Sequence, residues 1–298
     1  IISHSPHALK IESATLIYLD QFLIFVSMFT GIVDKAVRVG PKGYVLPNGF
    51  VGEASHIYNL KLRPDDIWVV TYPKAGTTWA QELVWMVAND CDYEKSNSLP
   101  LAARFPFLES DTVSSQPSPR FIKSHLPLSL LPPALLDTCK VVYVARDPRD
   151  VAVSYYNHHK LFNMLTFEGS FKEFWNMFIN DQLMSSPFFE NVKESWEKRN
   201  HPNMLFLFYE EFSKDLPSVV RRVADFLGKS IPEEQMSRLC EHLAFDSFIK
   251  NKTVNAEGLK DIGKAGGWRE DFDEEMTQEA ARWIEDQLRD TDLRFPEV

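Results

Sequence analysis

Short apolar runs that alternate with helical patterns restrict the fold of this chain more than any other feature. Strands are predicted at 66–72 (DIWVVTY), 120–125 (RFIKSH), 140–146 (KVVYVAR) and 204–209 (MLFLFY). Helices are predicted at 77–88, 148–162, 171–179, 190–198, 216–227, 232–243 and 274–288. Repeated strand-then-helix order predicts one α/β domain with a central parallel β-sheet flanked by helices. In such sheets, ligands bind beyond the carboxyl ends of the strands.

Composition and charge exclude several classes of protein. Hydrophobic residues make up 44% of the 298 residues and charged residues 25%, which excludes disorder, collagen and a coiled coil. The net charge of −10 attracts no nucleic acid, so an anionic ligand requires a locally built site. Cys91, Cys139 and Cys240 lie far apart, without the spacing of a zinc site or a disulfide framework. They indicate a reducing compartment, and we predict a cytoplasmic protein.

An apolar stretch at 14–33 precedes the first predicted strand. Asp20 and Gln21 interrupt it, and the uncharged run 21–33 is shorter than the roughly 20 residues that span a bilayer. We predict a packed or poorly fitting terminal segment and no membrane association. A membrane or secretory role stays open as the alternative.

The loop after the first strand, in the segment TYPKAGTTW (71–79), has the composition of an anion site. Backbone N–H groups between a strand and a helix converge with the positive end of the helix dipole. Gly76 permits close approach, Thr77 and Thr78 add hydroxyl donors, and Lys74 adds a charge. The segment is not a Walker A loop, because its lysine precedes its only glycine. The alternative is a turn with a solvated lysine.

A second anion site is predicted after the strand 140–146. Arg146 stands at the strand end and Ser154 about two turns into the next helix, so a guanidinium and a hydroxyl together can bind one anion. The alternative is that Arg146 pairs with Asp147 or Asp150.

Lys123 and His125, at the end of the strand 120–125, suit a general base with a charge-stabilising neighbour. A purely structural histidine is the alternative. The pair His158–His159 has no carboxylate at metal-ligand spacing, so we predict that it lies on a helix surface and that no metal is bound.

Together, TYPKAGTTW, KSHLP, VARDPRDVAVSYY and FLFYEEF resemble the cytosolic sulfotransferases in order and spacing, over roughly 40–288. The predicted division is therefore an apolar segment at 1–39 and a sulfotransferase domain at 40–298. The resemblance implies a P-loop nucleotide-kinase-like sulfotransferase fold. It also implies transfer of a sulfuryl group from 3′-phosphoadenosine 5′-phosphosulfate (PAPS) to a hydroxyl or amine. The acceptor would be a small apolar molecule, such as a phenol, sterol, alcohol or monoamine, and the product adenosine 3′,5′-bisphosphate (PAP).

The resemblance also implies a role for each site residue. The 5′-phosphosulfate would be held by the loop residues Lys74, Ala75, Gly76, Thr77, Thr78 and Trp79, with Trp79 stacked on adenine. Arg146 and Ser154 would bind the 3′-phosphate, while Tyr209 and Phe245 would contact the adenine and Gly263 would complete the cofactor site. His125 would be the base, Lys74 would stabilise the leaving oxygen, Lys123 the sulfuryl oxygens, and Ser154 would restrain Lys74. Phe107, and more weakly Phe50, would line the acceptor pocket.

The chain departs from the family pattern at 261–268. The family's RKGxxGDW reads DIGKAGGW here, which places Asp261 at the arginine position and predicts weakened cofactor binding, unless Lys260 or Lys264 compensates. The family's dimer motif barely survives at 269–278, so we predict a monomer or a weak homodimer. Two other functions stay open: a non-catalytic sulfotransferase-like binding protein and a P-loop small-molecule kinase.

Overall fold

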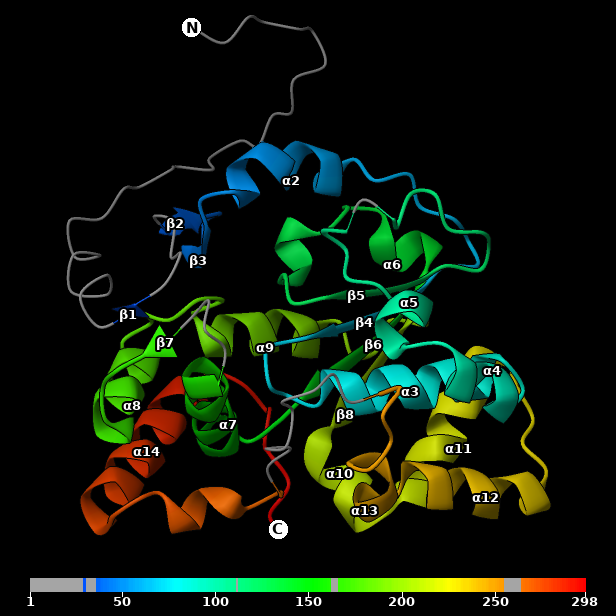
Figure 1. Cartoon of the computed structure of the whole chain (residues 1–298). Coiled ribbons are helices and arrows are strands. Elements are labelled where there is room, and N and C mark those ends of the chain that lie inside the picture. Colours follow the sequence, from blue (N-terminus) through cyan, green and yellow to red (C-terminus); the bar gives the residue numbers. More distant parts are fainter. Residues whose placement is uncertain (1–28, 31–35, 111, 162–165, 255–263) are drawn as a thin grey trace, which may run out of the picture.

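A four-stranded parallel sheet lies at the centre of the computed structural model, which describes residues 29–30, 36–110, 112–161, 166–254 and 264–298. Its strands run in the order β5 (Phe121–Ser124), β4 (Ile67–Thr71), β6 (Lys140–Ala145) and β8 (Met204–Phe208). All neighbouring pairs are parallel. The predicted fold class, a single α/β domain with a parallel sheet, is confirmed (Figure 1).

Both faces of the sheet are covered, which explains the uninterrupted apolar strand sequences. In β4, Trp68 and Val70 enter one buried core cluster and Val69 the other. In β6, Tyr143 and Val142 divide in the same way. Alternate side chains of a strand point to opposite faces, so the central positions of these strands are apolar on both faces.

Helices from different parts of the chain cover the two faces. One core cluster includes α3 (Thr77–Ala88), α11 (Leu216–Leu227) and α12 (Glu233–Leu243). The other includes α7 (Pro148–Leu161), α8 (Phe171–Ile179), α9 (Phe188–Glu197) and α14 (Glu274–Gln287). Figure 1 shows these as two separate groups of helices, below the sheet and to its left.

Shorter elements connect this frame. They are β1 (Phe29–Thr30), β2 (Ala36–Val39), β3 (Tyr44–Pro47), α2 (Phe50–Tyr58), α4 (Tyr93–Ser98), α5 (Leu101–Arg104), η1 (Leu128–Leu130), α6 (Leu135–Thr138), β7 (Thr166–Phe167), α10 (Tyr209–Lys214), α13 (Phe245–Phe248) and η2 (Gly267–Glu270).

The helix predictions hold best where caps fix the ends. The bounds of α3, α8 and α11 are those predicted. Ser170 and Glu173 form a capping box at α8, while Asp215 caps α11 and Gly228 ends it in the left-handed conformation. Tyr209, predicted as the last residue of a strand, instead begins α10. The side chain of Glu211 accepts the Phe208 N–H there, which stabilises a helix start.

The predicted terminal segment 14–33 lies outside the described residues except for Phe29–Thr30, which pair with β7. Val37 and Val39 of β2 pack in the same core as β4, and the division at residue 39 stays a prediction. In the part of the chain that is described, no helix has the length and apolarity needed to cross a membrane.

Candidate active site

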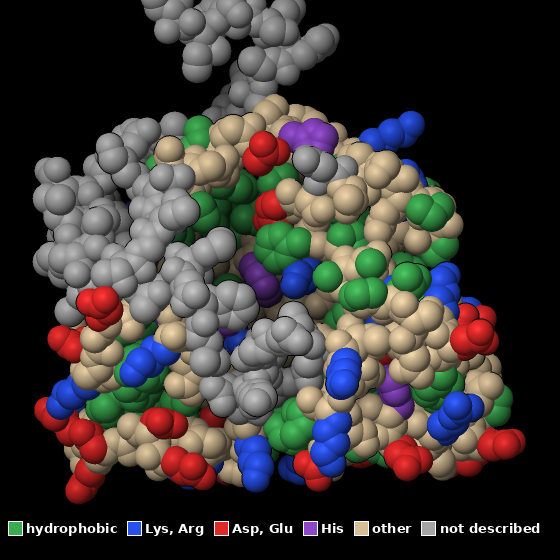
Figure 2. Space-filling model, in the orientation of Figure 1, with side chains coloured by type: hydrophobic (Ala, Val, Ile, Leu, Met, Phe, Trp, Pro, Cys, Tyr) green, Lys and Arg blue, Asp and Glu red, His purple; other side chains and the backbone are tan. Residues whose placement is uncertain are grey.

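The predicted site residues follow three strands and lie at one edge of the sheet. Because Val70 pairs with Ser124 and Thr71 with Val144, the residues that follow β4, β5 and β6 emerge side by side. These are the loop 72–76, His125 and Arg146. Figure 2 shows a hollow on the surface with histidine and Lys or Arg atoms on its floor. The carboxyl edge of the sheet is therefore the candidate site, as the sequence predicts.

The loop between β4 and α3 adopts a strained backbone. Lys74 has a φ of 66° and Gly76 a φ of 103°, both in the left-handed region. A Cβ at Gly76 would lie 2.5 Å from Cδ2 of Tyr209, so glycine is needed for space as well as for conformation. The Lys74 carbonyl accepts a hydrogen bond from Nη1 of Arg146 at 3.1 Å. The two predicted anion-binding segments therefore touch each other.

His125 is oriented by the end of β4. Its Nδ1 lies 2.9 Å from the carbonyl oxygen of Thr71, and 3.3 Å from the Thr71 hydroxyl. That hydroxyl also lies 2.6 Å from the hydroxyl of Thr77. A carbonyl only accepts, so Nδ1 carries the proton and Nε2 is left as the basic nitrogen. Burial, reinforced by the positive charges of Lys123 and Lys74, lowers the pKa of His125 to about 3, so the imidazole is neutral at pH 7.

Phe107 contacts both Lys123 and His125. Its ring lies 5.3 Å from the His125 ring, and Nζ of Lys123 lies 5.0 Å from the centre of the Phe107 ring. Backbone pairing fixes this arrangement, because the Lys123 N–H donates to Pro106 and the Lys123 carbonyl accepts from Leu108. Burial lowers the pKa of Lys123. An apolar wall thus stands beside the predicted base.

Arg146 does not follow the predicted alternative of pairing with Asp147 or Asp150. Its described hydrogen bonds go to the carbonyls of Lys74 and Lys264. Asp147 instead pairs with Arg149 at 2.5 Å, and Asp150 accepts the backbone N–H groups of Gly266 and Trp268. The guanidinium of Arg146 lies 4.2 Å from the centre of the Tyr209 ring. Ser154 lies on α7, as its spacing from Arg146 predicts, and it is buried there.

The predicted adenine residues gather around Trp79, which is only 4% exposed. Its indole N–H donates to the carbonyl of Leu243 at 2.9 Å. The rings of Tyr209 and Phe245 lie 5.5 and 6.3 Å from the Trp79 ring, both close to edge-on. These three residues form one aromatic group beside the loop. Glu210, next in sequence, accepts the Asp147 N–H, and burial raises its pKa to about 7.

The remaining predicted residues are Phe50, Gly263 and Asp261. Phe50 begins α2 and is buried in the core. Gly263 and Asp261 lie outside the described residues.

The surface position predicted for His158 and His159 is wrong for His159, whereas His158 is partly exposed. His159 is 1% exposed and packs on Tyr155 and Phe174, and burial lowers the pKa of both histidines. Helix periodicity turns this end of α7 toward α8, a contact that only the fold creates. Within the described ranges, no group of three or more metal-ligating side chains is arranged to hold an ion.

Sequence reasoning overlooked the residues that orient others. Thr71 fixes the tautomer of His125, and Asp150 fixes the segment 266–268 through two backbone N–H groups. A threonine directly before the loop and an acid in the first turn of a helix are too common to signal these roles.

The fold and this edge define an α/β protein in which the loop 72–76, His125 and Arg146 lie together at the carboxyl end of a parallel sheet. Residues 64–292 match the sulfotransferase domain family. Sulfotransferase 4A1 of Homo sapiens is 36% identical over 260 residues, covering 85% of this chain and 90% of that protein. Luciferin sulfotransferase of Photinus pyralis is 36% identical, covering 75% of this chain and 67% of that protein.

A solved structure of retinol dehydratase with androsterone and the inactive cofactor PAP superposes with a TM-score of 0.88. It is 40% identical and covers 95% of this chain and 98% of that one. The chain belongs to the sulfotransferase family, and the predicted enzyme class is confirmed.

Proposed function

We propose that this protein transfers the sulfuryl group of PAPS to the hydroxyl of a small apolar acceptor, with His125 as the general base. The observation that supports this most is the bond between His125 Nδ1 and the Thr71 carbonyl. It leaves the basic Nε2 on a strand end beside the anion loop. An acceptor hydroxyl within hydrogen-bond reach of Nε2 loses its proton to that nitrogen as it attacks.

The residues of the edge fit the donor. Gly76 lets the loop backbone approach closely, and the N-terminus of α3 favours negative charge there. Arg146 and Ser154 flank the position proposed for the 3′-phosphate, and Trp79, Tyr209 and Phe245 that for adenine. When bound, PAPS supplies an activated sulfuryl group. Lys74 and Lys123 then offset the negative charge on the oxygens around it.

The acceptor is an apolar alcohol in this proposal. Phe107 lies against both His125 and Lys123, so a non-polar molecule can rest on its ring with its hydroxyl at the imidazole. The retinol dehydratase structures contain androsterone or retinol, both apolar alcohols. We extend that acceptor class to this chain, as a hydroxysteroid or an isoprenoid alcohol. Phenols and monoamines stay within the broader prediction.

Dehydration of an isoprenoid alcohol is a second candidate reaction. It is favoured by the 40% identity with a protein named retinol dehydratase. Product analysis separates the two reactions, because sulfuryl transfer yields a sulfate ester and dehydration a hydrocarbon with one more double bond.

Several finer predictions accompany the proposal. We keep the expected weakening of cofactor binding by Asp261, the expected cytoplasmic location, and the expected monomer or weak homodimer. A non-catalytic binding protein would retain PAP binding without turnover, and a kinase would prefer ADP.

The deciding experiment compares PAP with ADP by calorimetry at equal concentrations. The proposal expects a clear preference for PAP, which Arg146→Met abolishes, followed by PAPS-dependent turnover of hydroxysteroids or isoprenoid alcohols. A conservative control, Arg221→Met, changes an exposed arginine of α11 and is expected to leave the preference intact. Equal binding of PAP and ADP by the unaltered protein would overturn the proposal.

A further inference from the structure

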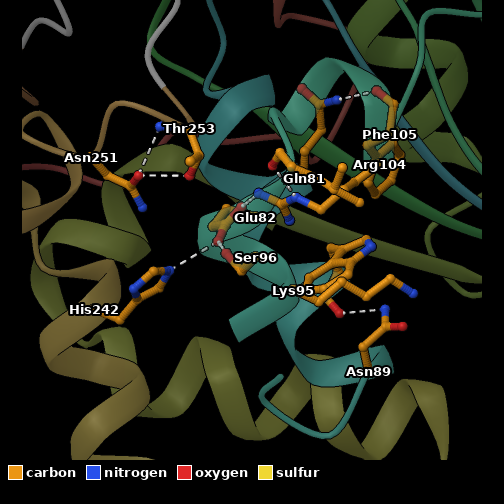
Figure 3. Close-up of polar contacts among 12 residues, drawn as sticks. Gln81, Glu82, Asn89, Lys95, Ser96, Arg104, Phe105, His242, Asn251 and Thr253 are labelled. Carbon is orange, nitrogen blue, oxygen red and sulfur yellow. Dashed lines mark hydrogen bonds and ion pairs between the residues drawn. The ribbon is translucent and has the colours of Figure 1, made fainter. Parts of the chain in front are cut away.

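A buried ionic cluster lies behind the candidate site, in the middle of α3. Glu82 accepts from Arg104 Nη2 at 2.8 Å, from the Ser96 hydroxyl at 2.7 Å and lies 2.9 Å from Nε2 of His242 (Figure 3). The side chains of Glu82 and Arg104 are 0% and 1% exposed. We call these four residues the Glu82 cluster. Each of them comes from a different helix or its end: α3, α4, α5 and α12.

The cluster keeps a full negative charge inside the protein. Burial alone would raise the pKa of Glu82, but the hydrogen bonds and charges of His242, Arg104 and Ser96 together lower it. Arg104 also donates to the Leu99 carbonyl at 3.0 Å and lies over the Trp85 ring. Replacing a buried ion pair by apolar residues is often neutral or stabilising, so stability alone does not explain why this chain keeps one.

We call the contact between Glu82 and Arg104 the Arg104 arm. It leads to the segment that carries Phe107, which we call the acceptor wall. Arg104 ends α5, and the chain continues directly into 105–108, which pairs with the backbone of Lys123. The Phe105 carbonyl accepts from Nε2 of Gln81 at 3.0 Å, so α3 holds this segment a second time. The position of the Phe107 ring against His125 therefore depends on how α5 is attached to α3.

We call the contact between Glu82 and His242 the His242 arm. It leads to the aromatic group around Trp79. His242 precedes Leu243, whose carbonyl accepts the indole N–H of Trp79, and α13 begins with Phe245. His242 ties this end of α12 to the same carboxylate that holds α5. One side chain, Glu82, thus connects the acceptor wall at Phe107 with the second wall of the site, the aromatic group around Trp79.

We propose that Glu82 is a positioning residue for the reaction. Through Arg104 it holds the acceptor wall, and through His242 it holds the wall that receives adenine. This inference rests on the proposed function for the identity of the two ligands. It predicts that the two arms can be loosened separately, with separate effects on acceptor and donor.

The first variant loosens the His242 arm. His242→Leu removes the donor to Glu82, while His242→Gln keeps an N–H that can reach it. We expect His242→Leu to weaken PAP binding about tenfold and to leave the acceptor KM within about twofold. His242→Gln should restore PAP binding toward that of the unaltered protein.

The second variant loosens the Arg104 arm. Glu82→Gln with Arg104→Gln keeps an acceptor for His242 and leaves no unpaired buried charge. We expect the acceptor KM to rise about tenfold, with PAP binding within about twofold. All measurements are made at a temperature at which circular dichroism shows every variant folded.

Amide hydrogen exchange on the same variants makes the test independent of any ligand. His242→Leu should increase exchange at 245–249 and not at 105–108, and the double variant should do the reverse. If both variants only lower the melting temperature, with affinities, KM values and exchange of the two segments unchanged or changed together, the inference is overturned. If the unaltered protein binds no PAP, the proposed function fails, and the exchange pattern still decides whether Glu82 holds the two walls.

Discussion

The loop before α3 and the middle of α3 use polar groups in opposite ways. In the loop, Lys74 and Gly76 adopt left-handed backbone conformations at the candidate site. In the middle of α3, the carboxylate of Glu82 is buried and bound by three neighbours. The first region has a strained backbone at the proposed donor site, and the second satisfies a buried charge entirely with protein groups. In our proposals, one helix therefore takes part both in the anion site and in holding the walls of the site.

The largest effect is expected at the open end. His125→Ala should reduce turnover by roughly 10²–10⁴-fold, because the acceptor proton loses its base, while PAP binding stays nearly unchanged. Steady-state kinetics and calorimetry measure the two effects. His56→Ala, at an exposed position of α2, is the control and should leave both unchanged. Activity within a few-fold of normal in His125→Ala would show that another group is the base.

The next effect concerns the buried cluster. Glu82→Leu leaves Arg104 without its carboxylate, which should lower the free energy of unfolding by about 3–5 kcal/mol. Urea denaturation measures this. In contrast, Glu275→Leu breaks the exposed pair with Lys172 and should leave the denaturation midpoint unchanged. Equal effects of the two substitutions would erase the distinction between a buried anchor and a surface pair.

Glu210 provides a pH-dependent test of the region beside Arg146. Its native pKa of about 7 exceeds the 4.5 of an exposed glutamate, so the folded state binds the proton more tightly. Its contribution to stability is therefore present below pH 4.5 and is lost as pH rises through 7, a change of about 3 kcal/mol. Glu210→Gln should remove this slope, so the variant gains stability relative to the unaltered protein between pH 4.5 and 7. Asp225→Asn, at an exposed site, is the control. A difference that stays constant with pH would contradict the buried carboxyl.

The smallest effect is expected when one of two glycines, Gly76 or Gly52, is replaced by alanine. Gly76→Ala forces a side chain into a left-handed conformation and against Tyr209, which should cost about 1–3 kcal/mol and weaken PAP binding. Gly52→Ala, in α2 with open space around it, should instead stabilise the protein by about 0.5–1 kcal/mol. Thermal unfolding and PAP calorimetry compare the two. Equal PAP affinity in both variants would show that the loop does not approach the ligand closely.

Much of the fold was predictable because its signals are local. The bounds of α3, α8 and α11 follow from periodicity and from caps within a few residues. The place of the loop 72–76 between a strand and a helix was predictable for the same reason, while its binding of an anion stays a prediction. The burial of His159 was not predictable, because Phe174 of α8 packs against it only once the chain has folded.

The Glu82 cluster shows most clearly what could not be predicted from the sequence. Its only sequence signal is a single acid among the apolar residues of 77–88, and Arg104 and His242 stand 22 and 160 residues away. Periodicity states which residues are apolar, but it does not state which distant charge will meet a buried carboxylate.

The sequence by itself determined the parallel sheet, the choice of its carboxyl edge as the candidate site, and the residue types that we propose to hold an anion there. The tertiary structure alone decided that Thr71 selects the tautomer of His125, that Tyr209 requires glycine at position 76, and that Glu82 joins the two walls. The physical reason is the distance along the chain over which each kind of interaction acts. Backbone propensities act over a few residues, whereas a proton's location or a buried charge's partner depends on groups that only packing brings within 3 Å.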